Sequence, residues 1–401
     1  LQQADLLILG GLNEDTWPPT PDTDPWLSRP MRASFGLPAP ERRIGLSAHD
    51  FVQGAAAPEV VLIRSAKVEG SPTVASRWLL RLGALIGEPG GAEAERAGSL
   101  LSWRRQMDAP AAPVPAAAAP FAPPLAARPR TLSVSDIESL VRDPYAVFAK
   151  RILGLRPLDA IEADPGAAQR GTLIHEALDS FTAAYPDELP HDALDRLREH
   201  GRKAFGETLT RPGVWAFWWA RFDQIAAWFI DHERARRKTI KLVAGEAAGT
   251  LSLEAPGGTF VLTARADRID RLPSGALAII DYKTGQIPAK AEVERGISPQ
   301  LPLEALIAEA GGFEGVSAAA VEALAYWQLM GGRDGGKERD ASDDAARSID
   351  EARDGLARLI AAFDDETTPY LARPRPGAQP NFSDYDHLAR YLEWGIAEHR
   401  R

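Results

Sequence analysis

Along residues 241–285, hydrophobic residues alternate with polar ones or form short β-branched runs, a pattern typical of strands. The stretches "TFVLTARADRIDRL" and "ALAIIDYKTG" flank a Pro-Ser-Gly turn at 273–275, so the pattern predicts a β-hairpin. A further strand is predicted over "VEALAYWQL", and a Gly- and charge-rich loop is predicted after it at 331–345.

The turn fixes the register of the predicted hairpin. If the three turn residues form the loop, Asp267 falls opposite Asp281 and Arg265 opposite Lys283. Directly opposed side chains share a face with Cβ atoms roughly 5 Å apart, where like charges destabilise the pair. The two aspartates therefore predict a cation between them.

Other stretches repeat their apolar residues at helical spacing. "AAQRGTLIHEALDSFTAAYP" predicts a helix of about 15 residues. Its apolar stripe consists of Ile174, Ala177, Leu178 and Phe181. A long Trp-rich helical region is predicted to end near residue 238. Its tryptophans are expected to pack in the core rather than to stack with nucleic-acid bases: Trp215, Trp218, Trp219 and Trp228.

The remaining helices are predicted from caps and breakers. In "TLSVSDIESLVRDPYAVFAKRIL", Ser133 or Ser135 is the expected N-cap, and Pro144 interrupts the helix or begins a second one. Two more helices are predicted near 347–363 and 383–399.

Three regions follow from these patterns. Residues 1–108 combine buried-strand signals, "DLLILGGL" and "EVVLIRSAK", with the helix-like "SRWLLRLGALIG", which indicates the end of an α/β domain with parallel strands. The Pro- and Ala-rich residues 109–130 predict a semi-extended linker. Residues 131–401 predict an α/β domain, in which helices flank a mixed sheet.

Composition narrows the function classes. The 401 residues include no cysteine, which excludes disulfides, thiolate zinc sites and cysteine nucleophiles and leaves His and carboxylates as metal ligands. No apolar run approaches the ~20 residues that span a bilayer, and no signal peptide is evident, so a cytoplasmic protein without membrane contact is expected. The net charge of -10 argues against a free-standing nucleic-acid binder. Because the chain begins at Leu1, it is expected to be a fragment.

Two carboxylates around a cation favour Mg²⁺ or Mn²⁺, which prefer oxygen ligands and bind phosphate. Lys283 lies two residues beyond Asp281, so on a strand it projects from the same face. This combination supports metal-dependent hydrolysis of phosphodiesters. The alternative is a pair of surface charges that only keeps the sheet soluble.

Four motifs in order carry a family resemblance. "GTLIH", "RADRID", "IIDYKTG" and "PQLPLEA" resemble the motif series of RecB-type PD-(D/E)XK nucleases. The flanking "DPYAVFAKRILGLRP" and "YDHLARYLEWG" resemble the AddB family, a subunit of AddAB helicase-nucleases. "LLILGGLNEDTWPP" is similar to the second RecA-like domain of superfamily 1 helicases, which is degenerate in that family. The resemblance implies a restriction-endonuclease-like fold preceded by the end of a RecA-like domain.

The resemblance also implies roles for individual residues. Asp267 and Asp281 would be carboxylate ligands of Mg²⁺ or Mn²⁺, His175 a nitrogen ligand, and the carbonyl of Tyr282 a further ligand. Lys283 would be the catalytic lysine, acting with Asp267 and Asp281.

Further positions match the family less fully. Glu246 lies where the family often has a glutamate on the preceding strand, and Gln300 matches the glutamine of a Gln-x-x-x-Tyr motif that contacts DNA. Glu304 replaces the tyrosine of that motif. Many members hold an iron-sulfur cluster on four cysteines. This chain has no cysteine, so that cluster is excluded, and Asp143 stands at one of the cysteine positions.

The implied function is a metal-dependent DNA exonuclease domain that resects double-strand break ends for recombinational repair, with an AddA-like helicase-nuclease subunit as partner. Two alternatives stay open from the sequence. One is a non-catalytic DNA-binding or scaffold subunit that keeps the nuclease fold. The other is an exonuclease of the same fold that acts without a helicase.

Overall fold

The computed structural model describes residues 4–21, 24, 26–87, 92–112, 120–158, 166–375, 377–380 and 382–398. The chain forms two compact units, Leu1–Pro113 and Val114–Arg401. The division falls inside the Pro- and Ala-rich region at 109–130.

The N-terminal unit is built on two short parallel strands, β1 (Leu7–Leu9) and β2 (Val60–Leu62). This pair agrees with the parallel strands expected there; nothing in it shows a RecA-like domain. The core consists of Leu9, Leu12 and Phe51. The other elements are α1 (Arg29–Ser34), α2 (Arg42–Ala55), β3 (Lys67–Val68), β4 (Ser71–Pro72), α3 (Arg77–Ile86) and α4 (Ala92–Asp108).

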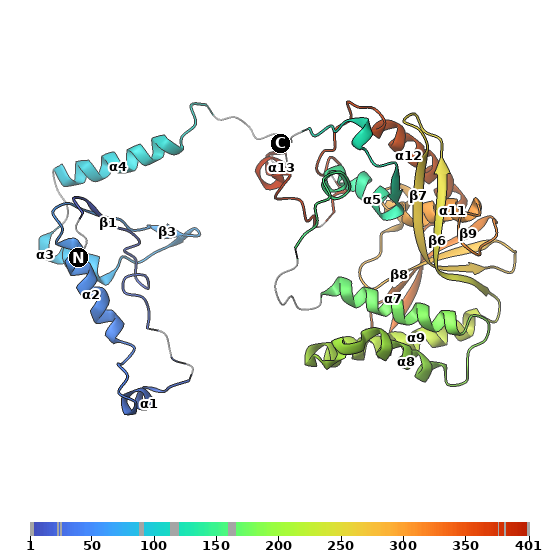
Figure 1. Ribbon diagram of the computed structural model, residues 1–401, viewed down its shortest axis with the longest axis horizontal. Helices are drawn as coiled ribbons and strands as arrows, with labels where there is room; N and C mark the ends of the chain where they lie inside the picture. Colours follow the sequence, from blue (N-terminus) through green and yellow to red (C-terminus); the bar gives the residue numbers. More distant parts are fainter. Residues whose placement is uncertain are drawn as a thin grey trace. The chain divides into compact units, whose positions relative to one another are not determined.

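The C-terminal unit contains a six-stranded mixed sheet (Figure 1). Its strands run in the order β10-β9-β8-β7-β5, and β6 pairs with the other edge of β7. The pairs β5/β7 and β8/β9 are parallel and the rest are antiparallel, as the predicted mixed sheet requires. The strands are β5 (Thr131–Ser133), β6 (Lys241–Leu253), β7 (Phe260–Arg271), β8 (Leu277–Lys283), β9 (Val321–Leu329) and β10 (Gly336–Asp340).

One edge of β7 is shared by two strands. β5 pairs with residues 261–263 and β8 with residues 268–271, while β6 follows the opposite edge over the whole length of β7. Residues 264–267 therefore lie in a fork between β5 and β8. Asp267 is the last residue of this fork.

Helices cover both faces of the sheet (Figure 1). Successive strand residues point to opposite faces. Accordingly, Ile280 and Tyr282 pack with α7, α8 and α9, whereas Leu277 and Ile279 pack with α5, α11 and α12. The helices are α5 (Val134–Arg142), α6 (Pro144–Val147), α7 (Ala167–Ala184), α8 (Ala193–Phe205), α9 (Ala220–Arg236), α10 (Lys290–Glu294), α11 (Gln300–Glu309), α12 (Ala345–Phe363) and α13 (Tyr391–Glu398).

Several local predictions are confirmed. The turn at 273–275 closes the hairpin, since the amide of Leu272 donates to the carbonyl of Ala276. Ser133 caps α5 in a capping box, and Pro144 begins α6. The whole predicted stripe of α7 is buried.

Three predictions are wrong in part. The loop expected at 331–345 contains β10, which pairs with β9. Residues 384–390 form turns, so the last helix begins at Tyr391 rather than near 383, and the described residues show it to Glu398. Trp215, expected in the core, is 53% exposed. The other three tryptophans of that set are partly buried against the α7–α9 core.

Within the described residues, no helix is both long and apolar enough to cross a membrane.

Candidate active site

Three acidic residues follow one another across adjacent strands. In β6, Gly245 pairs with Arg268 and Ala247 with Ala266, so Glu246 falls opposite Asp267 of β7. The β7/β8 ladder ends at the pair Arg268–Ile280, and its register continued by one residue places Asp281 opposite Asp267. The predicted opposition of the two aspartates is therefore present.

The ladder ends before the second predicted pair, Arg265 with Lys283. The backbone amide of Tyr282 donates to Asp267 Oδ2 at 2.6 Å instead of to a strand carbonyl. Arg265 is paired in the register with Ala248 of β6, and its guanidinium lies 2.6 Å from Glu246 Oε2. The side chain of Asp267 thus takes the place of a ladder acceptor where the strands part.

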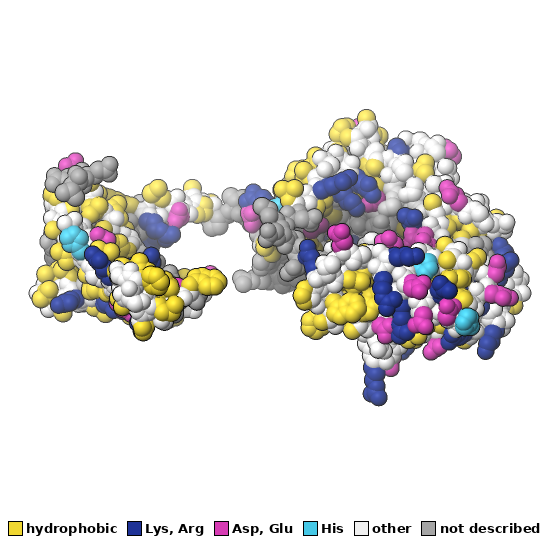
Figure 2. Space-filling view, turned by 60° about the horizontal axis from the view of Figure 1, so that its bottom comes forward, with side chains coloured by type: hydrophobic (Ala, Val, Ile, Leu, Met, Phe, Trp, Pro, Cys, Tyr) yellow, Lys and Arg dark blue, Asp and Glu magenta, His cyan; other side chains and the backbone are white. Residues whose placement is uncertain are grey.

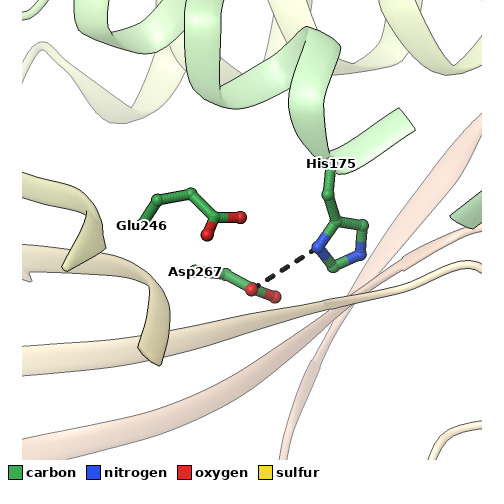
Figure 3. Close-up of side chains that lie close together, drawn as sticks. All are labelled: His175, Glu246 and Asp267. Carbon is green, nitrogen blue, oxygen red and sulfur yellow. Dashed lines mark ion pairs between the residues drawn. The ribbon is translucent and has the colours of Figure 1, made fainter. Parts of the chain in front are cut away.

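A possible metal site lies at the end of this fork. The site brings three ligand atoms within 4.8 Å of one another, one each from His175, Glu246 and Asp267. His175 reaches the strands from α7, and its Nδ1 is 3.4 Å from Asp267 Oδ1 (Figure 3). The two carboxylates offer the oxygen ligands that Mg²⁺ and Mn²⁺ prefer, and the imidazole adds a nitrogen ligand.

Glu246 adopts a strained backbone conformation, with φ at 44°. Left-handed φ values are uncommon for residues other than glycine and cluster at functional sites. The conformation aims the carboxylate at Asp267 from the neighbouring strand (Figure 3). The strain is therefore consistent with a ligand role.

Close approach of α7 to the strands brings His175 into reach. A Cβ added at Gly171, one turn before His175, would lie 3.0 Å from Thr284 Oγ1. Glycine at this position lets the helix pass the end of β8. The first of the four motifs thus supplies both the close contact and the imidazole.

Asp281 and Lys283 form a second group beside the first. Lys283 Nζ lies 3.0 Å from Asp281 Oδ1 and 2.8 Å from Oδ2. Gln300 joins both, since its Nε2 donates to Asp281 Oδ1 at 2.6 Å and its Oε1 accepts from Lys283 Nζ at 3.0 Å. Among the described atoms, Asp281 Oδ2 is buried and has no partner with hydrogen-bond geometry. Such an oxygen can take a further ligand.

Glu304 lies behind this group, one turn along α11 from Gln300. It is 1% exposed, and its Oε1 accepts from Gln300 Nε2 at 3.1 Å. Burial, together with the charge of Asp281, raises the pKa of Glu304 well above its ordinary value. The residue in the family's tyrosine position therefore supports the glutamine from within the core.

Burial and mutual charge set the protonation of the site. Burial raises the pKa of Asp281 to about 6, against the opposing charge of Lys283. Burial also raises the pKa of Glu246, with the charge of Asp267 adding to it. For His175, burial opposes the imidazolium, but the hydrogen bond and charge of Asp267 outweigh it, so the pKa is raised.

These shifts predict pH-dependent metal binding. Metal ligands must be deprotonated, and raised pKa values keep both Asp281 and His175 protonated to higher pH. We expect the affinity for Mn²⁺ to fall by more than about tenfold between about pH 7.5 and pH 5.5, because protons compete at both residues. Isothermal titration in buffers of different ionisation enthalpy measures both the affinity and the released protons.

The Asp281→Asn variant is the control for this dependence. Removing one titrating ligand should make the fall in affinity shallower and lower the number of protons released. An affinity that does not change with pH in the parent protein would contradict the assignment of these residues as ligands.

Most of the predicted residues come together here, although in two groups. The three-ligand cluster joins His175 and Asp267 with Glu246, which the sequence marked only as accessory; Asp281 lies with Lys283 and Gln300. The ligand roles of His175, Asp267, Asp281 and the Tyr282 carbonyl stay predictions. So do the catalytic role of Lys283 and the DNA contact of Gln300.

Asp179 is a neighbour to which sequence reasoning gave no role. It lies one turn beyond His175 on α7, and a Cβ added at Gly245 would be 3.1 Å from its Oδ1. Burial and the charge of Asp267, against the charge of Arg265, raise the pKa of Asp179. The i, i+4 spacing from His175 was the signal that could have found it.

The sequence profile of the PD-(D/E)XK nuclease superfamily matches residues 131–377. Proteins named "Uncharacterized protein" from Rickettsia bellii and Rickettsia felis are 29% and 30% identical over 317 and 320 residues. These matches cover 78% and 77% of this chain but only 37% of each Rickettsia protein. "Uncharacterized protein RT0391" from Rickettsia typhi is 35% identical over 210 residues, which are 51% of this chain and 24% of that protein.

A solved structure titled "Crystal structure of SSO0001" matches 57% of this chain and 76% of its own at 14% identity. Its TM-score of 0.25 is too low to establish a common fold.

The family profile takes in more than half of the 401 residues and includes every residue of the site described above. Through residues 131–377, the chain belongs to the PD-(D/E)XK nuclease superfamily.

Proposed function

We propose that this chain hydrolyses the phosphodiester bonds of DNA in the presence of Mg²⁺ or Mn²⁺. The observation that carries the proposal is the Lys283 ammonium, held against Asp281 beside the cluster of His175, Glu246 and Asp267. A surface charge pair has no need of this arrangement, because Asp281 is only 3% exposed and its ionised form is costly to bury.

His175, Glu246 and Asp267 would hold the cation, with Asp281 as a further carboxylate toward it. A divalent cation bound by these groups lowers the pKa of water and offsets the charge of the scissile phosphate. Lys283 brings a fixed positive charge to the place where negative charge develops in the transition state. Gln300 keeps the lysine and Asp281 in one orientation through its two hydrogen bonds.

We further propose that the chain is part of an AddB-like subunit. On this proposal it resects broken DNA ends for recombinational repair as an exonuclease, acting on single strands that an AddA-like helicase-nuclease partner unwinds. The motif series and its flanks support this assignment. A partner subunit would also supply positive charge that a chain of net charge -10 lacks.

Cleavage of end-labelled single-stranded DNA tests the proposal. The chain is assayed with Mg²⁺, with Mn²⁺ and with EDTA, alone and with the helicase partner and ATP. We expect cutting that needs the metal and that Asp281→Ala abolishes. Asp343→Ala is the matched control, because Asp343 is an exposed aspartate paired with Lys290 on the surface.

The scaffold alternative predicts a different result. If the parent protein binds DNA or its partner but does not cut under any of these conditions, the nuclease fold serves assembly only. Cutting that survives Asp281→Ala would instead place the active site elsewhere.

A further inference from the structure

Aromatic side chains lie exposed on the π-helical segment η4 (Val214–Trp219). Trp215 is 53% exposed and Phe217 is 69% exposed. The rings of Trp215 and Trp219 stack with an interplanar angle of 3° and centroids 5.9 Å apart. We call the stacked pair Trp215 and Trp219 the aromatic face.

The aromatic face is anchored to the core. Trp219 packs edge-on against Phe205 and at a tilt against Phe222, and both of these rings are fully buried. Because Trp215 stacks on Trp219, one side of the Trp215 ring is fixed as well. The face is therefore a preformed surface, which reduces the ordering cost of binding a ligand.

A cation lies against the aromatic face. The guanidinium of Arg202 lies 5.4 Å from the ring centroid of Trp219, and Lys203 and Arg221 are exposed nearby in sequence. Within the described part of the chain, none of these three cations is paired with a carboxylate. The neighbouring Asp195 and Asp223 are both engaged by Arg198.

The face lies at the end of the sheet that carries Lys283. Lys283 pairs with Gln328 of β9, and β9 ends at Leu329. A Cβ added at Gly331 would be 2.5 Å from the carbonyl oxygen of Arg221, at the start of α9 directly after η4. From strand spacing and rise, the backbone path from Lys283 to Arg221 is on the order of 15–20 Å.

Figure 2 shows hydrophobic side chains gathered beside Lys and Arg side chains on the face that α7, α8 and α9 cover. Met330, 57% exposed, lies on the path between the aromatic face and β8. An exposed apolar surface with interleaved cations matches the chemistry of a single strand, whose bases stack on aromatic rings while its phosphates meet cations.

We infer that the aromatic face binds the bases of single-stranded DNA at the end of the sheet that carries the catalytic groups. Unpaired bases are required, because bases inside a duplex are stacked on each other and cannot reach a protein ring. The inference rests on the proposed function, since the strand bound at the aromatic face would be the strand that is cut. Binding itself does not depend on cleavage.

Fluorescence anisotropy with labelled oligo-dT in EDTA tests the inference without any cutting. We expect Trp215→Ala to weaken binding by about fivefold or more, as the loss of base stacking on one ring requires. Arg202→Glu combined with Lys203→Glu should weaken it as well and make its loss with salt shallower, because fewer phosphates are neutralised. Trp103→Ala is the matched control, an exposed tryptophan of the N-terminal unit.

Quenching of tryptophan fluorescence by oligo-dT gives a second measurement, and it should be smaller in Trp215→Phe than in Trp103→Phe. Circular dichroism shows whether the variants fold. The charge-reversal variant changes only exposed side chains, so it answers the question even if the aromatic variant unfolds. Unchanged affinity in both variants would overturn the inference and leave the face as a docking surface for a protein.

The two proposals can fail separately. If the parent protein binds oligo-dT through the aromatic face but never cuts DNA, the inference holds and the proposed function fails. If it cuts DNA and the aromatic variant cuts long strands with an unchanged KM, the proposed function holds and the inference fails. A rise in KM for long strands, with kcat unchanged, supports both.

Discussion

Replacing Lys283 with methionine is expected to slow DNA cleavage by at least about a hundredfold, the effect of removing one preorganised charge or donor from a transition state. Methionine keeps the length and the apolar stem of the side chain but removes the ammonium that lies 2.8 Å from Asp281 Oδ2. Single-turnover cleavage with saturating Mg²⁺ measures the chemical step directly.

Metal binding separates this variant from a ligand variant. The lysine competes with a cation for Asp281, so Lys283→Met should bind Mn²⁺ at least as tightly as the parent protein. Lys290→Met is the matched control, because Lys290 is 42% exposed and pairs with Asp343 away from the site. Cleavage by Lys283→Met at the parental rate would remove the lysine from the mechanism.

Replacing Arg268 with methionine is expected to lower the free energy of unfolding of the C-terminal unit by about 3 kcal/mol. Arg268 is 1% exposed and lies between Glu233 and Asp270, neither of which is exposed. Removing the guanidinium leaves these buried carboxylates to Arg236 and Arg237 alone. The loss is therefore expected at the lower end of the range for a broken buried pair.

Amide hydrogen exchange in β7 and α9 measures this loss without assuming that the two units unfold together. Arg234→Met is the matched control on the surface of α9, since Arg234 is 50% exposed and pairs with Asp231, which is 80% exposed. It should change stability by less than about 1 kcal/mol. Equal effects of the two variants would contradict a structural role for the buried network.

The hairpin shows how far the sequence alone reaches. Its turn, its register and the opposition of Asp267 and Asp281 follow from period-two alternation and a Pro-Ser-Gly turn, both of which are local signals. The same alternation, read on β8, correctly places Lys283 with Asp281. Local patterns were sufficient to predict those features whose geometry is set by residues close together in the sequence.

Other features depend on contacts between distant segments. β10 has polar, charged residues and no hydrophobic alternation, and it becomes a strand only because β9 offers it an edge. Trp215 has the helical spacing of a core residue, but the place against Phe205 and Phe222 is taken by Trp219, and Trp215 stacks on the outside of that ring. Neither outcome leaves a local mark on the sequence.

Glu246 was underestimated for a related reason. The β6/β7 register shifts between Leu242 and Ala244, and without that shift Glu246 would not fall opposite Asp267. A bulge of one residue moves side chains to the other face and gives little sequence signal. Placing this ligand therefore required the three-dimensional structure.

The fork in the sheet determines which site residues would remain in a related protein that has lost nuclease activity. Asp267 accepts the amide of Tyr282, a residue that is 4% exposed, and so closes the gap between β7 and β8. Losing it would leave a buried donor unpaired, at a cost of about 1–3 kcal/mol. Selection for folding alone would thus keep Asp267 in lineages where the nuclease has decayed.

Lys283 does not close a gap in the backbone in this way, because among the described residues its ammonium donates to the side chains of Asp281 and Gln300 and to no backbone carbonyl. In related proteins that have lost the activity, Lys283 should be substituted before Asp267. On the proposed function, the residue at position 283 therefore indicates better than the residue at position 267 whether a related chain cuts DNA.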